Sequence, residues 1–198
     1  SIQAALDELN TERAKRLATR KLPITGVSEF PNPTEAKLER KAWQNVPQFA
    51  GLNWRRDAEV FEELRDATDG TDAKVFLACL GTRRDFGARE GFASNYFHIA
   101  GLATPQVEGG STDEIVAAWQ ASGTPVVCLC SSAKIYAEQG IEVARALKDA
   151  GAKRVLLAGN IKELGDESAG ELIDGTIAMG MDVVAGLNEI LDVLEVRK

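Results

Sequence analysis

The sequence has a single histidine, three cysteines and an aromatic content of only 6%. It lacks any apolar run approaching the roughly 20 residues of a membrane-spanning helix, and its first ten residues lack the apolar centre of a signal peptide. The net charge is -7, and no run of Lys or Arg would supply the phosphate contacts that nucleic-acid binding requires. These absences predict a cytoplasmic protein with no nucleic-acid and no membrane partner.

The cysteines and the histidine are the first candidates for catalysis or metal binding. Cys79, Cys128 and Cys130 are in stretches that we interpret as strands, so we expect buried free thiols in a reducing compartment. Cys128 and Cys130 could form a metal or redox pair, but such pairs usually need two intervening residues and further ligands. His98 ends an aromatic stretch, where it is expected to cap or pack a helix. We therefore expect no catalytic residue and no metal site.

Residues 1–72 are interpreted as a linker and docking arm. Several prolines interrupt this region. One short helical pattern begins at Ile2, and another runs from Asp57 to Ala67. Large apolar side chains on an irregular segment need a surface to cover them. Those side chains are Trp43, Phe49 and Trp54. We expect this arm to dock on a partner or neighbouring domain and to remain outside the core of the following domain.

Residues 73–198 alternate short apolar stretches with helical patterns. This rhythm is typical of a parallel sheet that is covered by helices on both faces. Right-handed crossovers then predict an α/β fold with a doubly wound, flavodoxin-like, five-stranded parallel sheet, whose ligands bind beyond the carboxyl ends of the strands. The predicted strands are Lys74–Leu80, Leu102–Gln106, Thr124–Cys130, Arg154–Ala158 and Thr176–Met179.

Residues at these strand ends keep the spacing of the cobalamin-binding pattern Asp-x-His-x-x-Gly, Ser-x-Leu and Gly-Gly. They are Thr82 at the aspartate position, Arg84 at the histidine position, Gly87, Cys130, Ser132 and Gly159. The domain thus resembles a cobalamin-binding domain whose cobalamin-holding residues have been replaced. In that family the histidine coordinates cobalt and the aspartate orients it. Because arginine has no lone pair for a metal, the resemblance implies that this chain binds no cobalamin.

Three longer stretches resemble the C-terminal region of the small, non-catalytic subunits of heterodimeric methylmalonyl-CoA mutases. They are Ile24–Pro31, Arg89–Phe97 and Gly151–Gly159. The resemblance covers essentially the whole chain and implies that it follows a barrel domain that is absent here. It also implies a large catalytic subunit as partner, which holds adenosylcobalamin and interconverts succinyl-CoA and methylmalonyl-CoA in propionate metabolism. This chain would then contribute assembly and would be inactive alone.

Two other hypotheses remain open from the sequence. The domain could be a carrier that binds cobalamin without a protein ligand to cobalt. It could also be an independent small α/β enzyme that uses Cys130 or His98, which would need a pocket joining those side chains and a perturbed thiol pKa. For Arg83, Arg84 and Asp85, the simplest interpretation is a solvated loop with a local ion pair.

Overall fold

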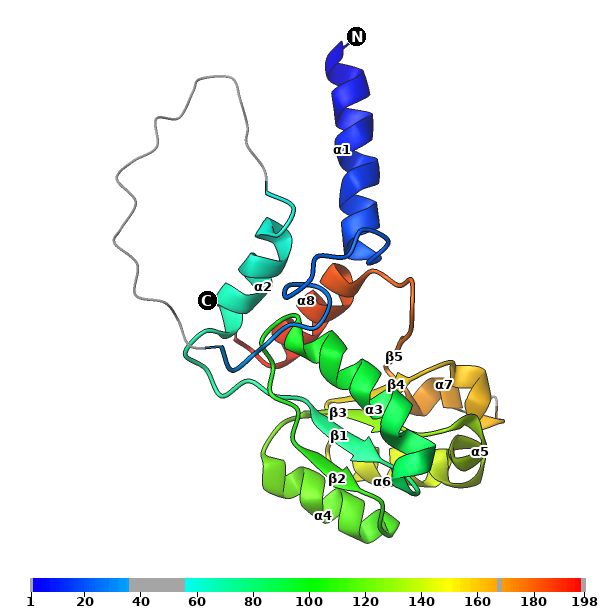
Figure 1. Ribbon diagram of the computed structural model, residues 1–198. Coiled ribbons are helices and arrows are strands. Elements are labelled where there is room, and N and C mark those ends of the chain that lie inside the picture. Colours follow the sequence, from blue (N-terminus) through cyan, green and yellow to red (C-terminus); the bar gives the residue numbers. More distant parts are fainter. Residues whose placement is uncertain (1, 36–55, 167–168, 197–198) are drawn as a thin grey trace.

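Five strands form a parallel sheet at the centre of the structure (Figure 1). The computed structural model describes residues 2–35, 56–166 and 169–196. The strands are β1 (Phe76–Cys79), β2 (Gln106–Glu108), β3 (Val126–Cys130), β4 (Arg154–Ala158) and β5 (Gly175–Ile177). They lie in the order β2-β1-β3-β4-β5, and each adjacent pair is parallel. This is the flavodoxin order with its switch point between β1 and β3, so the predicted α/β fold is confirmed.

Two strands differ from the predicted positions. The second was predicted to begin at Leu102, but the ladder begins at Gln106. Leu102 is fully buried, and the pairing nearby is an isolated bridge between Lys74 and Ala103, with a backbone hydrogen bond from Val75 N–H to the Ala103 carbonyl. The fifth strand ends before Met179, which is 87% exposed. Both errors arose because apolar character marks burial, whereas the short edge strands are defined by their backbone hydrogen bonds.

Helices cover both faces of this sheet. The helical segments of the described residues are α1 (Ile2–Ala18), α2 (Glu59–Thr68), α3 (Arg83–His98), α4 (Thr112–Ser122), α5 (Ala133–Ile135), η1 (Tyr136–Gly140), α6 (Ile141–Asp149), η2 (Ile161–Leu164), α7 (Ala169–Leu172) and α8 (Val183–Val193). Residues of α2, α3 and α8 share an apolar cluster with Leu77 and Cys79. Residues of α4, α6 and α7 share the other cluster with Phe76 and Ala78. Alternate residues of β1 therefore supply the two halves of the core.

Parts of the predicted docking arm lie in this core. Phe61 and Leu64 of α2 are 0% and 3% exposed, and they belong to the same apolar cluster as the inner face of α8. Leu17 at the end of α1 is also buried there, whereas Ile2 and Leu9 are exposed. Figure 1 shows α1 extending away from the sheet, while α2 lies beside α8.

The division between residues 1–72 and 73–198 stays a prediction. The aromatic residues on which the docking arm was based, Trp43, Phe49 and Trp54, lie outside the described residues. Within the described part of the chain, no helix is both long and apolar enough to span a lipid bilayer.

Each strand is followed by a helical segment that begins with a capping side chain. The capping residues are Thr82, Ser111, Ser132, Asn160 and Asp182. Three of these turns carry an acidic residue at the third helical position, whose carboxylate accepts the N–H of the capping residue. Local side-chain hydrogen bonds therefore shape the loops at the carboxyl edge of the sheet.

Candidate functional site

The positions that match the cobalt-binding motif lie in the first turn of α3. Thr82 is the N-cap, and its backbone N–H and hydroxyl donate to Asp85 Oδ2 over 2.9 and 2.6 Å. These hydrogen bonds hold the pKa of Asp85 below its usual range. Arg84 is exposed, and Arg83 forms an ion pair with Glu108 over 2.7 Å. The expected solvated loop is therefore a capped helix start, and its ion pair reaches the next strand.

The second part of the motif lies where β3 ends. Ser132 caps α5, and its hydroxyl accepts from the backbone N–H of Ile135. Ser131 is fully buried, and its hydroxyl donates to the Leu80 carbonyl oxygen over 2.8 Å. The backbone N–H of Leu80 in turn donates to the carbonyl of Cys130 over 3.0 Å. The ends of β1 and β3 are thus joined at the switch point, and the part played by Ser131 was not identified from the sequence.

The three thiols are buried and free, as the sequence predicted. Cys79 and Cys130 are register partners on β1 and β3, and Cys130 Sγ lies 3.8 Å from the Cys128 carbonyl oxygen. A hydrogen bond with Cys130, together with burial, raises the pKa of Cys79, and a hydrogen bond with Cys128, together with burial, raises the pKa of Cys130. A nucleophilic cysteine needs a lowered thiol pKa, so the environment disfavours this chemistry. Among the described residues, no group of three His, Cys, Asp or Glu side chains could hold a metal ion.

His98 lies at the last residue of α3, the opposite end of that helix from Arg84. Its Nε2 is 3.1 Å from the Thr104 hydroxyl, which also lies 3.2 Å from the Ser94 hydroxyl. Burial lowers the pKa of His98, and the nearby Arg65 lowers it further. The imidazole therefore packs the end of a helix, as expected, and does not face the thiols at the carboxyl ends of β1 and β3.

Three side chains from separate elements meet over the end of β4. Arg89 of α3 donates from Nη1 to the Ala158 carbonyl oxygen over 2.7 Å, and its Nη2 lies 2.7 Å from Glu163 Oε2. The guanidinium also lies over the ring of Tyr136, 5.4 Å from its centroid. Tyr136 is fully buried, and its hydroxyl lies 2.9 Å from the carbonyl oxygens of both Leu129 and Ala158. We call Arg89, Tyr136 and Glu163 the strand-end clamp.

The clamp explains the glycine that the motif retains at the end of β4. Gly159 has φ +139°, which other residues rarely adopt, and a Cβ there would lie 1.8 Å from Arg89 Nη1. The glycine thus makes room for a side chain of its own protein. At Gly87 a Cβ would make only an ordinary contact of 3.8 Å with Arg83. The sequence located this edge, but the clamp was not identified from it, because its members are far apart in the chain and lie outside the cobalamin-binding pattern.

The residues at the motif positions and in the clamp do not fit cobalamin. The exposed guanidinium of Arg84 offers no lone pair to cobalt. The clamp covers the end of β4, with its Arg89 and Glu163 side chains 29% and 22% exposed. That this chain binds no cobalamin remains a prediction, and no chemistry at this edge is derived from the cofactor.

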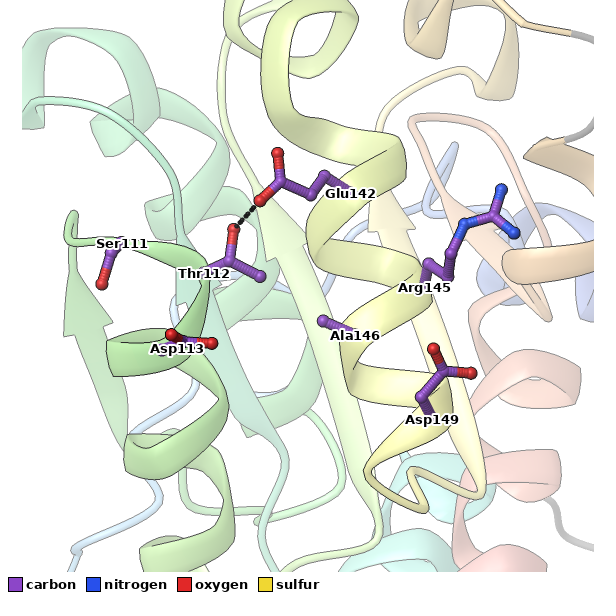
Figure 2. A pocket seen from close by; sticks show the side chains of 7 residues that line it. All are labelled: Ser111, Thr112, Asp113, Glu142, Arg145, Ala146 and Asp149. Atoms are coloured by element: carbon purple, nitrogen blue, oxygen red, sulfur yellow. Dashed lines mark hydrogen bonds between the residues drawn. The ribbon is translucent and has the colours of Figure 1, made fainter.

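A separate pocket of ≈ 380 Å³ lies between the start of α4 and the outer face of α6 (Figure 2). Figure 2 shows Thr112 and Glu142 bridging these helices, with the Thr112 hydroxyl donating to Glu142 Oε1 over 2.7 Å. Asp113, Arg145 and Asp149 also line the pocket. The lining includes acidic side chains and one arginine, Arg145. These residues were not singled out from the sequence.

Comparison with known proteins identifies long relatives that share this segment. The chain is 57% identical over 201 residues to "Methylmalonyl-CoA mutase small subunit" of Propionibacterium freudenreichii subsp. shermanii, covering 100% of this chain and 32% of the relative. It is 46% identical over 189 residues to the protein of the same name from Streptomyces virginiae, covering 91% and 29%. It is 32% identical over 193 residues to "Probable methylmalonyl-CoA mutase small subunit" of Mycobacterium tuberculosis (strain ATCC 25618 / H37Rv), covering 93% and 30%.

No protein-family model matches the chain. The chain spans about a third of the length of the curated relatives it matches, 32% in the Propionibacterium protein. The alignments with the three relatives described cover all or nearly all of its residues. The sequence resemblance is therefore confirmed, and this chain is homologous along its length to a segment of methylmalonyl-CoA mutase small subunits.

Proposed function

We propose that this chain is a non-catalytic structural domain of a methylmalonyl-CoA mutase small subunit. It would support the cobalamin-dependent interconversion of succinyl-CoA and methylmalonyl-CoA by a large catalytic subunit. The names of the relatives state both the mutase and the small subunit, and a small subunit implies a partner subunit. In this proposal the partner holds adenosylcobalamin, and the present chain contributes to the assembly of a heterodimer.

The observation that carries this proposal is the strand-end clamp over the end of β4. Doubly wound folds bind their ligands in the crevice at this edge, near the switch point. Here the clamp residues Arg89, Tyr136 and Glu163 cover the end of β4 with hydrogen bonds, an ion pair and a ring contact. The position of the family's cobalt ligand is Arg84, which cannot coordinate a metal. These features favour a role in assembly over one in cofactor binding.

The test for cofactor binding is a titration of the purified chain with adenosylcobalamin and with hydroxocobalamin, followed by absorbance. We expect no saturable spectral change at micromolar concentrations, because Arg84 cannot ligate cobalt and the clamp covers the end of β4. The large subunit, titrated under the same conditions, is the positive control. A saturable change with micromolar affinity would contradict the proposal and would favour the alternative of a cobalamin carrier that lacks a protein ligand to cobalt.

The assembly role is tested separately in the complete small subunit. The segment equivalent to residues 73–198 is deleted, and the truncated subunit is co-expressed with the large subunit. We expect less heterodimer in size-exclusion chromatography and a matching loss of mutase activity per large subunit. Purified heterodimers that do form should retain their affinity for adenosylcobalamin, because the cofactor belongs to the partner in this proposal. A normal yield of active heterodimer would contradict an assembly role.

A further inference from the structure

The strand-end clamp surrounds a planar cation with two oxygen acceptors and an aromatic ring. The Ala158 carbonyl oxygen accepts from Arg89 Nη1, and the Glu163 carboxylate pairs with Arg89 Nη2, each over 2.7 Å. The ring of Tyr136 lies under the guanidinium. A carbonyl, a carboxylate and an aromatic face, arranged around one fork of N–H donors, are the groups that recognise guanidinium in proteins.

These acceptors are held by contacts that do not involve Arg89. The hydroxyl of Tyr136 is anchored at the carbonyl oxygens of Leu129 and Ala158, each 2.9 Å away. The other carboxylate oxygen of Glu163 accepts the backbone N–H of Asn160 over 3.2 Å, as part of the capping box of η2. A site whose groups are positioned by other contacts is preorganised for its ligand. The acceptors should therefore keep their arrangement when the cation is removed.

We propose that the Ala158 carbonyl, the Glu163 carboxylate and the Tyr136 ring form a binding site for a guanidinium cation, which Arg89 occupies as an internal ligand. If the Arg89 side chain is removed, the site becomes open to a free guanidinium compound. The inference rests on the contacts of the clamp and holds whether or not the proposed function is correct. A binding site differs from a simple structural ion pair in one testable way. An ion pair alone predicts that the contacts are lost when Arg89 is substituted and that no free cation takes its place.

The test uses Arg89→Ala in the full chain, with amide hydrogen exchange of η2 as the readout. The control is Arg84→Ala, which removes an exposed arginine from the same helix. We expect exchange in η2 to rise at least about tenfold in Arg89→Ala and to be unchanged in the control, because two charge-assisted contacts are lost only in the former. Equal exchange rates in the two variants would overturn the proposal.

Rescue distinguishes a binding site from a lost ion pair. Millimolar methylguanidinium chloride should slow exchange in Arg89→Ala about tenfold when its concentration is ten times its Kd. Sodium chloride at equal ionic strength controls for screening, and methylammonium chloride provides the same charge without a planar fork. Neither control salt should slow the exchange. Exchange that responds equally to all three salts, or to none, would overturn the proposal.

A second variant covers the case in which Arg89→Ala does not fold. Glu163→Gln weakens the clamp but leaves Arg89 in the site. We expect faster exchange of η2 than in Arg84→Ala and no response to methylguanidinium, since the internal ligand still occupies the site. If Glu163→Gln exchanges at the rate of the control variant, Glu163 is not part of a cation site and the proposal fails.

Discussion

Tyr96 of α3 and Gly186 of α8 form a close contact that can be tested by a double-mutant cycle. Tyr96 is 1% exposed, and its hydroxyl has no hydrogen-bond partner among the described residues. A Cβ built on Gly186 would lie 2.3 Å from that hydroxyl but 3.7 Å from the ring carbon that bears it. The glycine thus accommodates one oxygen atom, and that atom gains no hydrogen bond in return.

The two single substitutions should have opposite effects on the free energy of unfolding. Tyr96→Phe removes an unsatisfied buried hydroxyl, which is worth up to about 1–3 kcal/mol of added stability. Gly186→Ala gains about 1 kcal/mol of helix propensity but forces an overpacked contact that costs about 1–3 kcal/mol. We expect Gly186→Ala alone to be neutral or destabilising by up to about 2 kcal/mol. Tyr96 cannot easily move aside, because its ring packs edge-on against Phe97.

In the Tyr96→Phe background the sign should reverse. The nearest remaining ring atom is 3.7 Å from the new Cβ, an ordinary contact, so Gly186→Ala should then stabilise by about 1 kcal/mol. The coupling energy from urea unfolding of all four proteins should be about 1–3 kcal/mol, with unchanged m-values. A loss of more than about 1 kcal/mol in Tyr96→Phe would show that the hydroxyl has a partner. An alanine effect that is equal in both backgrounds would refute the steric argument.

Three further predictions concern the histidine, the cobalt-ligand position and the docking arm. Burial lowers the pKa of His98 below its ordinary value of 6.5, so the unfolded chain binds more protons than the folded chain below that pH. The free energy of unfolding should therefore fall as the pH drops below about 6.5. His98→Gln should remove this pH dependence in urea unfolding measured between pH 5 and 8. Arg84→His alone should not confer cobalamin binding, because the clamp still covers the end of β4; micromolar affinity in an absorbance titration would contradict this. Limited proteolysis, read by mass spectrometry, should cut first within residues 22–42 and leave residues 74–198 resistant. Early cleavage inside the sheet domain would show that the division near Asp72 is wrong.

The fold could be predicted because its central strands are apolar on both faces. The expected strand Arg154–Ala158 coincides with β4, and β3 lies within Thr124–Cys130. Edge strand β2 was misplaced because its residues are half-exposed or exposed, and so carry no apolar signal. Burial at Leu102 instead reflects packing between a helix and the sheet. Hydrophobic patterning thus locates elements that are covered on both sides, and it loses precision at the edges of the sheet.

The site could be located but not described from the sequence. The spacing of the motif placed Cys130 and Gly159 at the ends of neighbouring strands, where the structure has them. The contact between Arg89 and Ala158 joins residues 69 positions apart, and nothing in either neighbourhood indicates that they meet. Such contacts depend on how α3, η1 and η2 pack against one another. A local pattern contains no information on that arrangement.

The capping boxes at the carboxyl edge affect which substitutions this protein can tolerate. Each box closes within four residues of sequence, as in the pairs Thr82 with Asp85 and Ser111 with Glu114. Each loop is therefore an autonomous module whose shape is encoded locally, and substitutions in separate modules should act additively. Among the three capping boxes in the described part of the chain, Glu163 is the carboxylate that serves both its own turn and a distant helix, through Asn160 and Arg89. Sequence drift at this edge should be tolerated one loop at a time, except at Glu163, where a single substitution disturbs two modules at once.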